Sequence, residues 1–231
     1  MTDPRERLII ALDVPSAAQA QRLVAAVGES GVFYKVGKQL FTAEGPQVVR
    51  DLVAAKRKVF LDLKYHDIPT TVAGAVSEAA KLGADLVTVH ASGGGKMLRA
   101  AVDAARARPG MAVLAVTVLT SLNDDDLDKI GIRGHVLDQV LRLAAIALTD
   151  GCQGVVASAR EARQLRAEFG QDFLLVTPGV RPAGSAVGDQ ARVVTPAEAF
   201  AAGASHIVVG RPIAEALDPA AAAREILEVA A

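Results

Sequence analysis

The feature that most constrains the fold of this chain is a regular alternation of short β-type runs with alanine-rich helical segments. The β-type runs are rich in valine, isoleucine and leucine, which is typical of strands buried on both faces. We expect eight strands, at residues 8–14, 33–38, 59–65, 86–91, 112–119, 154–159, 173–178 and 206–211. The helical segments that follow them are 16–27, 42–55, 70–82, 96–107, 136–150, 159–169, 196–202 and 219–229.

Eight strand–helix units in 231 residues match the count and size of an α/β (β/α)8 TIM barrel. We therefore expect a single domain over residues 1–231. A doubly wound open sheet is the alternative, but it would need a glycine-rich turn after the first strand. That turn reads Asp13-Val14-Pro15-Ser16 and has no glycine. We expect longer loops at 124–128 and 182–192.

A cluster of charges ends the third predicted strand. Residues 59–71 contain Asp62, Lys64 and Asp67, with Pro69 just beyond. Side chains alternate along a strand, so Asp62 and Lys64 should share one face, and Asp67 should follow at the turn. Taken alone, the cluster fits either a solvated salt bridge that caps a strand or an active site, because buried charges need partners or a ligand.

The barrel favours the active site, because its catalytic residues lie at the carboxyl ends of the strands. Those ends carry polar residues, whereas the strand interiors are apolar. The polar set at this mouth is Asp13, Lys35, Asp62, Lys64, His90, Thr120, Arg181 and Arg211. For His90 a structural hydrogen bond is an equally good explanation.

The end of the eighth predicted strand indicates a phosphate site. Gly210 and Arg211 come just before a short helix expected at 213–217, and Arg181 follows the seventh strand. Loops after strands seven and eight of this fold commonly bind phosphate, and arginine offers a planar fork of donors. An ion pair of Arg211 with Glu215 is the competing explanation.

The segment 181–192 is rich in small residues and fits either a lid over a ligand or an ordinary surface loop. Gln190, near its end, could reach inward.

Composition excludes several other classes. The formal net charge of −1 gives no overall electrostatic case for binding nucleic acid or an anionic membrane. No apolar run approaches the ~20 residues of a membrane span. The single cysteine cannot form an internal disulfide or a cysteine-based metal site. We expect a cytoplasmic protein.

Together these segments resemble the orotidine 5′-phosphate decarboxylase family, in its monofunctional bacterial form, over essentially the whole chain. The most specific segment is Asp62-Leu-Lys64-Tyr-His-Asp67-Ile-Pro. The other carrying segments are Ala-Leu-Asp13, Lys35-Val-Gly, Leu-Thr120-Ser, Thr-Pro-Gly-Val-Arg181-Pro, Gly-Asp-Gln190 and Val-Gly210-Arg211-Pro.

The resemblance implies a cofactor-independent decarboxylation of orotidine 5′-monophosphate in pyrimidine biosynthesis. Lys64 would protonate C6 of the pyrimidine after CO2 departs, and Asp62 would lie against the substrate carboxylate. Lys35, Asp62, Lys64 and Asp67 would form an alternating charge network. The remaining implied contacts are Asp13 and Lys35 to the ribose, Thr120 and Ser121 to the pyrimidine edge, Arg181, Gly210 and Arg211 to the phosphate, and Gln190 to both phosphate and base.

The resemblance also implies a homodimer with shared sites, in which Asp67 and Thr71 serve the partner's pocket, and it implies no metal. Two alternatives stay open. One is a Mg²⁺-dependent sugar-phosphate decarboxylase or aldolase of the same superfamily; Lys35, placed where a cation would need carboxylates, argues against it. The other is a non-catalytic binder of phosphoribosyl ligands, which would not need a lysine between two acids.

Overall fold

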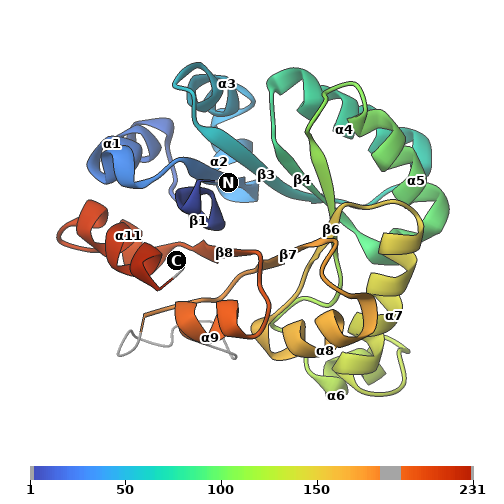
Figure 1. The fold of residues 1–231 in the computed structure, drawn as a ribbon. Helices are drawn as coiled ribbons and strands as arrows, with labels where there is room; N and C mark the ends of the chain where they lie inside the picture. Colours follow the sequence, from blue (N-terminus) through green and yellow to red (C-terminus); the bar gives the residue numbers. More distant parts are fainter. Residues whose placement is uncertain (1–2, 183–193, 230–231) are drawn as a thin grey trace.

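The computed structural model describes residues 3–182 and 194–229. Within them, eight parallel strands form a closed barrel in chain order, and Figure 1 shows the helices as a ring around it. The strands are β1 (Leu8–Ala11), β2 (Phe33–Gly37), β3 (Lys58–Tyr65), β4 (Leu86–His90), β5 (Ala112–Val116), β6 (Gly154–Val156), β7 (Leu174–Thr177) and β8 (His206–Val209).

Closure of the barrel confirms the predicted fold. Each strand pairs in parallel with the next, and β8 returns to β1 with Leu8 opposite Ile207. Every predicted strand is present, but most end earlier than expected. The last apolar residues of several runs have already left the sheet, because they enter the loops that build the mouth of the barrel.

The helices are α1 (Ala17–Val27), α2 (Lys38–Glu44), α3 (Gln47–Ala54), α4 (Pro69–Leu82), α5 (Gly94–Ala105), α6 (Asp124–Lys129), α7 (Val136–Thr149), α8 (Ala159–Phe169), α9 (Pro196–Ala201), α10 (Arg211–Ala214) and α11 (Pro219–Glu228). Short 3₁₀ turns lie at η1 (Pro4–Arg7), η2 (Gly28–Ser30) and η3 (Ala91–Gly93).

Two predictions about helices and loops were wrong, and a third placed a helix with shifted bounds. The expected helix 42–55 is two helices, since Gly45 adopts φ of +68° and ends α2, and Pro46 follows it. The expected loop 124–128 is helical, because Asn123 and Asp126 form a reciprocal capping box that starts α6. The short helix expected at 213–217 begins earlier and is α10, so Arg211 is its first residue.

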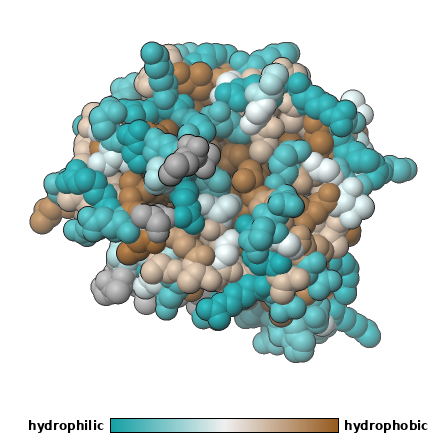
Figure 2. Space-filling model, in the orientation of Figure 1, coloured by the Kyte–Doolittle hydropathy of each residue, from teal (hydrophilic) through white to brown (hydrophobic). Residues whose placement is uncertain are grey.

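Alternation along the strands divides the core into two layers. Ile9 and Ala11 of β1 point into the barrel, where they pack with Phe33, Phe60 and other inward side chains. The residues between them join the larger cluster under the helices. The barrel interior is thus a packed core, and a ligand can enter only at a mouth. Figure 2 shows a mostly hydrophilic outer surface on the helix ring, with apolar residues toward the middle of the same view.

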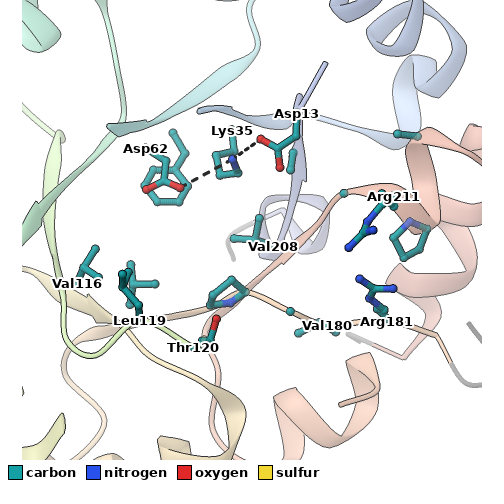
Figure 3. A pocket seen from close by; sticks show the side chains of 18 of the residues that line it. Asp13, Lys35, Asp62, Val116, Leu119, Thr120, Val180, Arg181, Val208 and Arg211 are labelled. Carbon is teal, nitrogen blue, oxygen red and sulfur yellow. Dashed lines mark hydrogen bonds and ion pairs between the residues drawn. The ribbon is translucent and has the colours of Figure 1, made fainter. Parts of the chain in front are cut away.

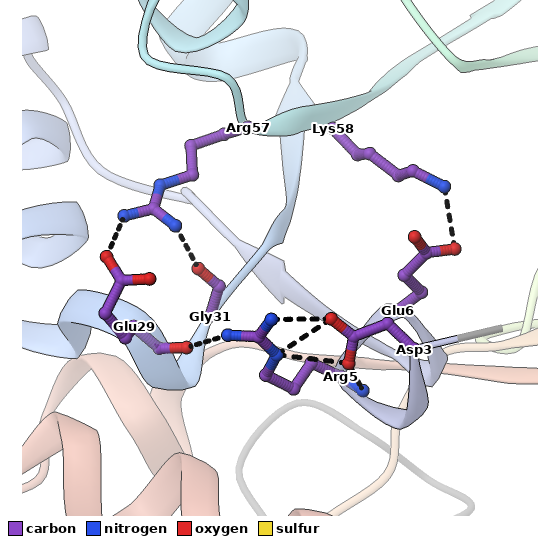
Figure 4. A network of polar contacts seen from close by, with 7 residues as sticks. All are labelled: Asp3, Arg5, Glu6, Glu29, Gly31, Arg57 and Lys58. Atoms are coloured by element: carbon purple, nitrogen blue, oxygen red, sulfur yellow. Dashed lines mark hydrogen bonds and ion pairs between the residues drawn. The ribbon is translucent and has the colours of Figure 1, made fainter.

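Ion pairs tie the elements together at the amino end of the barrel (Figure 4). Glu6 of η1 pairs with Lys58 at the start of β3, with 2.7 Å between Nζ and Oε2. Arg5 donates to the Glu29 carbonyl at 2.8 Å, and Arg57 pairs with the Glu29 carboxylate. These contacts lie at the face away from the strands' carboxyl ends, where residues of a barrel serve stability.

Among the described residues, no helix has the length and apolar character needed to cross a membrane.

His206, at the start of β8, makes the stability of the fold sensitive to acid. Burial, followed by the nearby Arg7 charge, lowers the pKa of His206 to about 4, and its ring packs edge-on against Phe33. An unfolded histidine titrates near 6.5. Between these values the unfolded chain binds a proton that the native state does not, so stability falls as the pH falls.

We expect His206→Gln to flatten this loss of stability. Urea denaturation of wild type should show a drop between pH 7 and pH 4.5 that exceeds that of the variant by about 2 kcal/mol. The comparison uses the pH dependence of each protein, so an overall offset from the lost Phe33 contact does not matter. Parallel curves for the two proteins would contradict the assignment.

Candidate active site

A pocket of about 650 Å³ opens where the carboxyl ends of the strands meet. This volume suits a small-molecule ligand. Its lining brings together most of the charged residues expected at the mouth, which come from different strands and loops: Asp13, Lys35, Asp62, Lys64, Arg181 and Arg211. Parallel strands of a closed barrel direct their ends to one side, which explains why residues so far apart in sequence converge.

Asp62 is the centre of a compact charge cluster. Lys64 Nζ lies 2.7 and 2.8 Å from the two oxygens of the Asp62 carboxylate. Lys35 Nζ lies 3.8 Å from Asp62 and 2.8 Å from Asp13, so it links the two acids, as Figure 3 shows. Lys35 is itself only 8% exposed. A buried lysine and a largely buried aspartate are tolerated because each offsets the other's charge.

The pKa of Asp62 reports this balance. Burial, the largest influence, raises the pKa, because it disfavours the charged form. The charges of Lys64 and Lys35, with hydrogen bonds from Lys64 and Thr88, outweigh burial and bring the pKa below its ordinary value. The carboxylate therefore stays ionised at neutral pH inside the pocket.

The backbone around Lys64 is irregular. Between Leu61 and Tyr65 strand β3 advances four residues while its partner β4 advances two, from Val87 to Val89. Lys64 adopts φ of +52°, a left-handed conformation that costs a residue other than glycine roughly 1–3 kcal/mol. The side chains of Asp62 and Lys64 do meet, as predicted, but through this bulge and not through simple alternation.

The opposite wall of the pocket carries the two arginines. Figure 3 shows the guanidinium groups of Arg181 and Arg211 close to each other and across the cavity from Asp62. Gly210 caps α10, so Arg211 starts the helix at the pocket wall. Glu215 also lines the pocket. Arg181 N donates to Val194 O at 2.9 Å, next to a parallel bridge between Val180 and Val194.

The other expected site residues divide between those that line this pocket and those that do not. Thr120 lines the pocket, whereas Ser121 is exposed beyond it. Asp67 is exposed on the turn after β3, where it accepts a hydrogen bond from Ile68 N at 2.6 Å, and Thr71 is exposed on the first turn of α4. Neither Asp67 nor Thr71 is among the described residues that line this pocket. Gln190 and most of the expected 182–192 loop fall outside the described residues.

Two further residues support the cluster, in roles that their positions in the sequence do not indicate. Gly37 ends β2, and a Cβ there would lie 2.8 Å from Lys35 Nζ and 3.1 Å from Asp13 Oδ1. Thr88 is fully buried on β4 and hydrogen-bonds to both Asp62 and Lys64. The available signal for Thr88 was a hydroxyl in an otherwise apolar stretch of strand.

The two histidines near the mouth contact each other. The rings of His66 and His90 lie 5.4 Å apart, and neither lines the pocket among the described residues. Burial, then the proximity of His66 and Lys38, lowers the pKa of His90. A neutral histidine at the end of β4 is consistent with packing beside the charge cluster.

Among the described residues, no group of three or more histidine, cysteine, aspartate or glutamate side chains is placed to hold a metal ion. The donors at the pocket suit an anion better than a cation. Asp62, the buried carboxylate of the pocket, is already held between the ammonium groups of Lys35 and Lys64.

Fold and pocket together define a (β/α)8-barrel protein with an ammonium–carboxylate cluster facing two guanidinium groups at the carboxyl ends of its strands. The profile of the orotidine 5′-phosphate decarboxylase / HUMPS family matches residues 6–226. The chain therefore belongs to this family.

Individual relatives agree over nearly the full length. Orotidine 5′-phosphate decarboxylase of Afipia carboxidovorans is 54% identical over 226 residues, covering 98% of this chain and 95% of the relative. The protein of the same name from Anaeromyxobacter dehalogenans is 55% identical, with 96% and 97% covered. A crystal structure of orotidine 5′-phosphate decarboxylase from Lactobacillus acidophilus superposes with a TM-score of 0.87 at 41% identity, covering 96% of this chain and 97% of that one.

The charge balance at Asp62 can be tested directly. Lys64→Ala removes the nearer ammonium but leaves the carboxylate buried, so we expect the pKa of Asp62 to rise. The readout is a pH titration of ¹³C-labelled aspartate carboxyl groups by NMR, with the Asp62 signal identified by its loss in Asp62→Asn. Lys81→Ala, which removes an exposed lysine paired with Glu78, is the control. An Asp62 titration that Lys64→Ala leaves unchanged would show that other groups set its ionisation.

Proposed function

We propose that this chain decarboxylates orotidine 5′-monophosphate to uridine 5′-monophosphate and CO2, a step of de novo pyrimidine biosynthesis. The observation that carries the proposal is the Lys35–Asp62–Lys64 cluster, which lies across one pocket from Arg181 and Arg211. A phosphorylated substrate with a second anionic group would span these two walls. The relatives that carry the decarboxylase name support the same reaction.

The chemical problem is a poorly stabilised carbanion. When the bond between C6 and the carboxylate breaks, the electron pair stays on C6 in the plane of the ring and cannot delocalise into the π system. Stabilisation must then be electrostatic, from a positive charge held beside C6 in a water-poor site. Lys64 supplies that ammonium and afterwards donates a proton to C6, and solvent returns the proton to the amine.

Asp62 would raise the free energy of the bound substrate relative to the transition state. The substrate carboxylate would lie beside the ionised Asp62 carboxylate, and like charges at short range repel. Departure of neutral CO2 relieves this repulsion, so the interaction favours the transition state over the bound substrate. The low pKa of Asp62 supports this role, because a protonated acid would not repel.

Groups remote from C6 would hold the substrate in this environment. We assign the phosphate to Arg181, Arg211 and the Gly210 amide, and the ribose hydroxyls to Asp13 and Lys35. Thr120 and Ser121 would contact the pyrimidine edge, and Gln190 would join phosphate and base. Binding energy from these contacts offsets the unfavourable placement of two carboxylates side by side.

A homodimer with shared sites completes the proposal. Asp67 and Thr71 are exposed beside Ile68, which is 67% exposed, an unusual position for a large apolar side chain. A second copy covering this surface would bury Ile68 and bring Asp67 to the neighbouring pocket.

We further place the enzyme in the cytoplasm, since a nucleotide is too highly charged to cross a membrane unaided.

The Mg²⁺-dependent sugar-phosphate reaction of the same superfamily is the alternative, and one assay separates the two. We expect purified protein to turn over orotidine 5′-monophosphate with EDTA present, followed by loss of the substrate's absorbance. Lys64→Ala should lower kcat by about 10⁴-fold or more, because it removes both the stabilising charge and the proton donor. Its affinity for uridine 5′-monophosphate should change little.

Lys81→Ala, on the exposed face of α4, is the matched control and should retain full activity. A strict requirement for Mg²⁺ would favour the alternative reaction. Turnover by Lys64→Ala within tenfold of wild type would remove the role assigned to that lysine.

Shared sites predict recovery of activity on mixing inactive subunits. A heterodimer of Lys64→Ala with Asp67→Ala has one pocket with both lesions and one with neither. Random reassociation should therefore restore roughly a quarter of wild-type activity. Mixing Lys64→Ala with Asp62→Ala is the control, because both lesions fall on the same side of each pocket. Confirmed heterodimers without recovery would count against sharing.

A further inference from the structure

Thr88 occupies a special position beside the charge cluster. It lies in the middle of β4, is fully buried, and follows Leu86 by two residues, so it points to the inner side of the barrel. Its hydroxyl accepts a hydrogen bond from Lys64 N at 2.9 Å and donates one to Asp62 Oδ1 at 2.9 Å. A single side chain thus contacts the backbone of one catalytic residue and the carboxylate of the other.

The direction of both hydrogen bonds is fixed by chemistry. A backbone N–H can only donate, so the Thr88 oxygen must accept from Lys64. An ionised carboxylate can only accept, so the hydroxyl proton must point at Asp62. The low pKa of Asp62, to which this bond contributes, agrees with that assignment.

The bulge explains why such a bond is needed. Strand β3 is out of register with β4 between Leu61 and Tyr65, and the chain turns left-handed at Lys64. Residues within a bulge lose their ladder partners, and a buried amide without an acceptor is unfavourable. Thr88 supplies the acceptor from the neighbouring strand, so it stabilises the conformation that points Lys64 toward Asp62.

We propose that Thr88 is a positioning residue for the decarboxylation. Its hydroxyl fixes the Lys64 backbone and the Asp62 carboxylate relative to each other. This inference rests on the proposed function of the same pocket. Thr88 does not line the pocket among the described residues, so it acts through Lys64 and Asp62 and not on the substrate. Misplacement of reacting groups by about 1 Å can lower a rate by about 10²-fold.

Two substitutions separate the hydroxyl from the rest of the side chain. Thr88→Val keeps the shape and removes the hydroxyl, whereas Thr88→Ser keeps the hydroxyl and removes the methyl group. We expect Thr88→Val to lower kcat for orotidine 5′-monophosphate by about 10- to 100-fold, with KM and the affinity for uridine 5′-monophosphate within threefold. Thr88→Ser should stay within about fivefold of wild-type kcat.

Thr117→Val is the matched control, since Thr117 is a buried threonine just after β5 whose hydroxyl donates to the Val156 carbonyl at 3.0 Å. It loses one buried hydrogen bond of similar kind without touching Lys64 or Asp62. We expect its kcat to stay within threefold. A loss equal to that of Thr88→Val would mean that Thr88 contributes only general stability, which would overturn the proposal.

The pH profile adds a readout that a purely structural role would not move. Without the Thr88 donor the pKa of Asp62 should rise, so the acidic limb of kcat/KM should shift to higher pH in Thr88→Val and not in Thr88→Ser. An unshifted limb together with unchanged kcat would overturn the proposal. If Thr88→Val does not fold, Thr88→Ala and Thr88→Ser form the deciding pair, and equal kcat values would overturn it.

Failure of the proposed function can be told apart from failure of this inference. Wild-type protein that does not decarboxylate orotidine 5′-monophosphate would contradict the proposed function by itself. The NMR titration of Asp62 would then test the geometry. A pKa raised in Thr88→Val but not in Thr88→Ser would support the positioning by Thr88, and equal values in all three proteins would overturn it.

Discussion

The structure of the pocket depends on a buried carboxylate that stays ionised. Burial alone would raise the pKa of Asp62, and the two lysines with the Thr88 hydroxyl reverse that tendency. Each partner comes from a different place: Lys35 from β2, Lys64 from the irregular end of β3, and Thr88 from β4. The ion pairs and the Thr88 hydrogen bonds thus require three neighbouring strands held in a fixed alignment, including the bulge between β3 and β4. Loss of that alignment would leave a charge without its partners, which is strongly unfavourable inside a protein.

The closed barrel supplies that alignment. It also places residues that serve stability and residues that form the pocket on opposite faces. Its interior is filled by apolar side chains such as Phe33 and Phe60, which lie between the amino and carboxyl faces. The amino face carries ion pairs such as Glu6–Lys58 that tie elements together. The carboxyl face concentrates like and unlike charges around a cavity, where strain such as the left-handed Lys64 can be tolerated.

Much of the fold and part of the pocket could be predicted from sequence, because they follow from local patterns of residues. The eight β-type runs predicted the barrel, and the D-x-K spacing predicted that Asp62 and Lys64 lie together, although the bulge and not simple alternation brings them into contact. Two kinds of information were out of reach. The bulge at Lys64 and the hydrogen bonds of Thr88 depend on the pairing of β3 with β4, which residue spacing does not encode. The role proposed for Asp67 involves a second copy of the chain, and among the described contacts its carboxylate accepts a hydrogen bond from the adjacent Ile68 N.

The pairing of Val180 with Val194 has a consequence for how this pocket could change over evolution. Arg181 N is anchored to Val194 O, so the arginine is held by backbone contacts at the base of the intervening segment. This contact fixes the main chain of Arg181 at the wall of the pocket. Substitutions that preserve the Val180–Val194 pairing therefore retain the backbone of this wall, while the side chains that line the pocket can vary on that fixed frame.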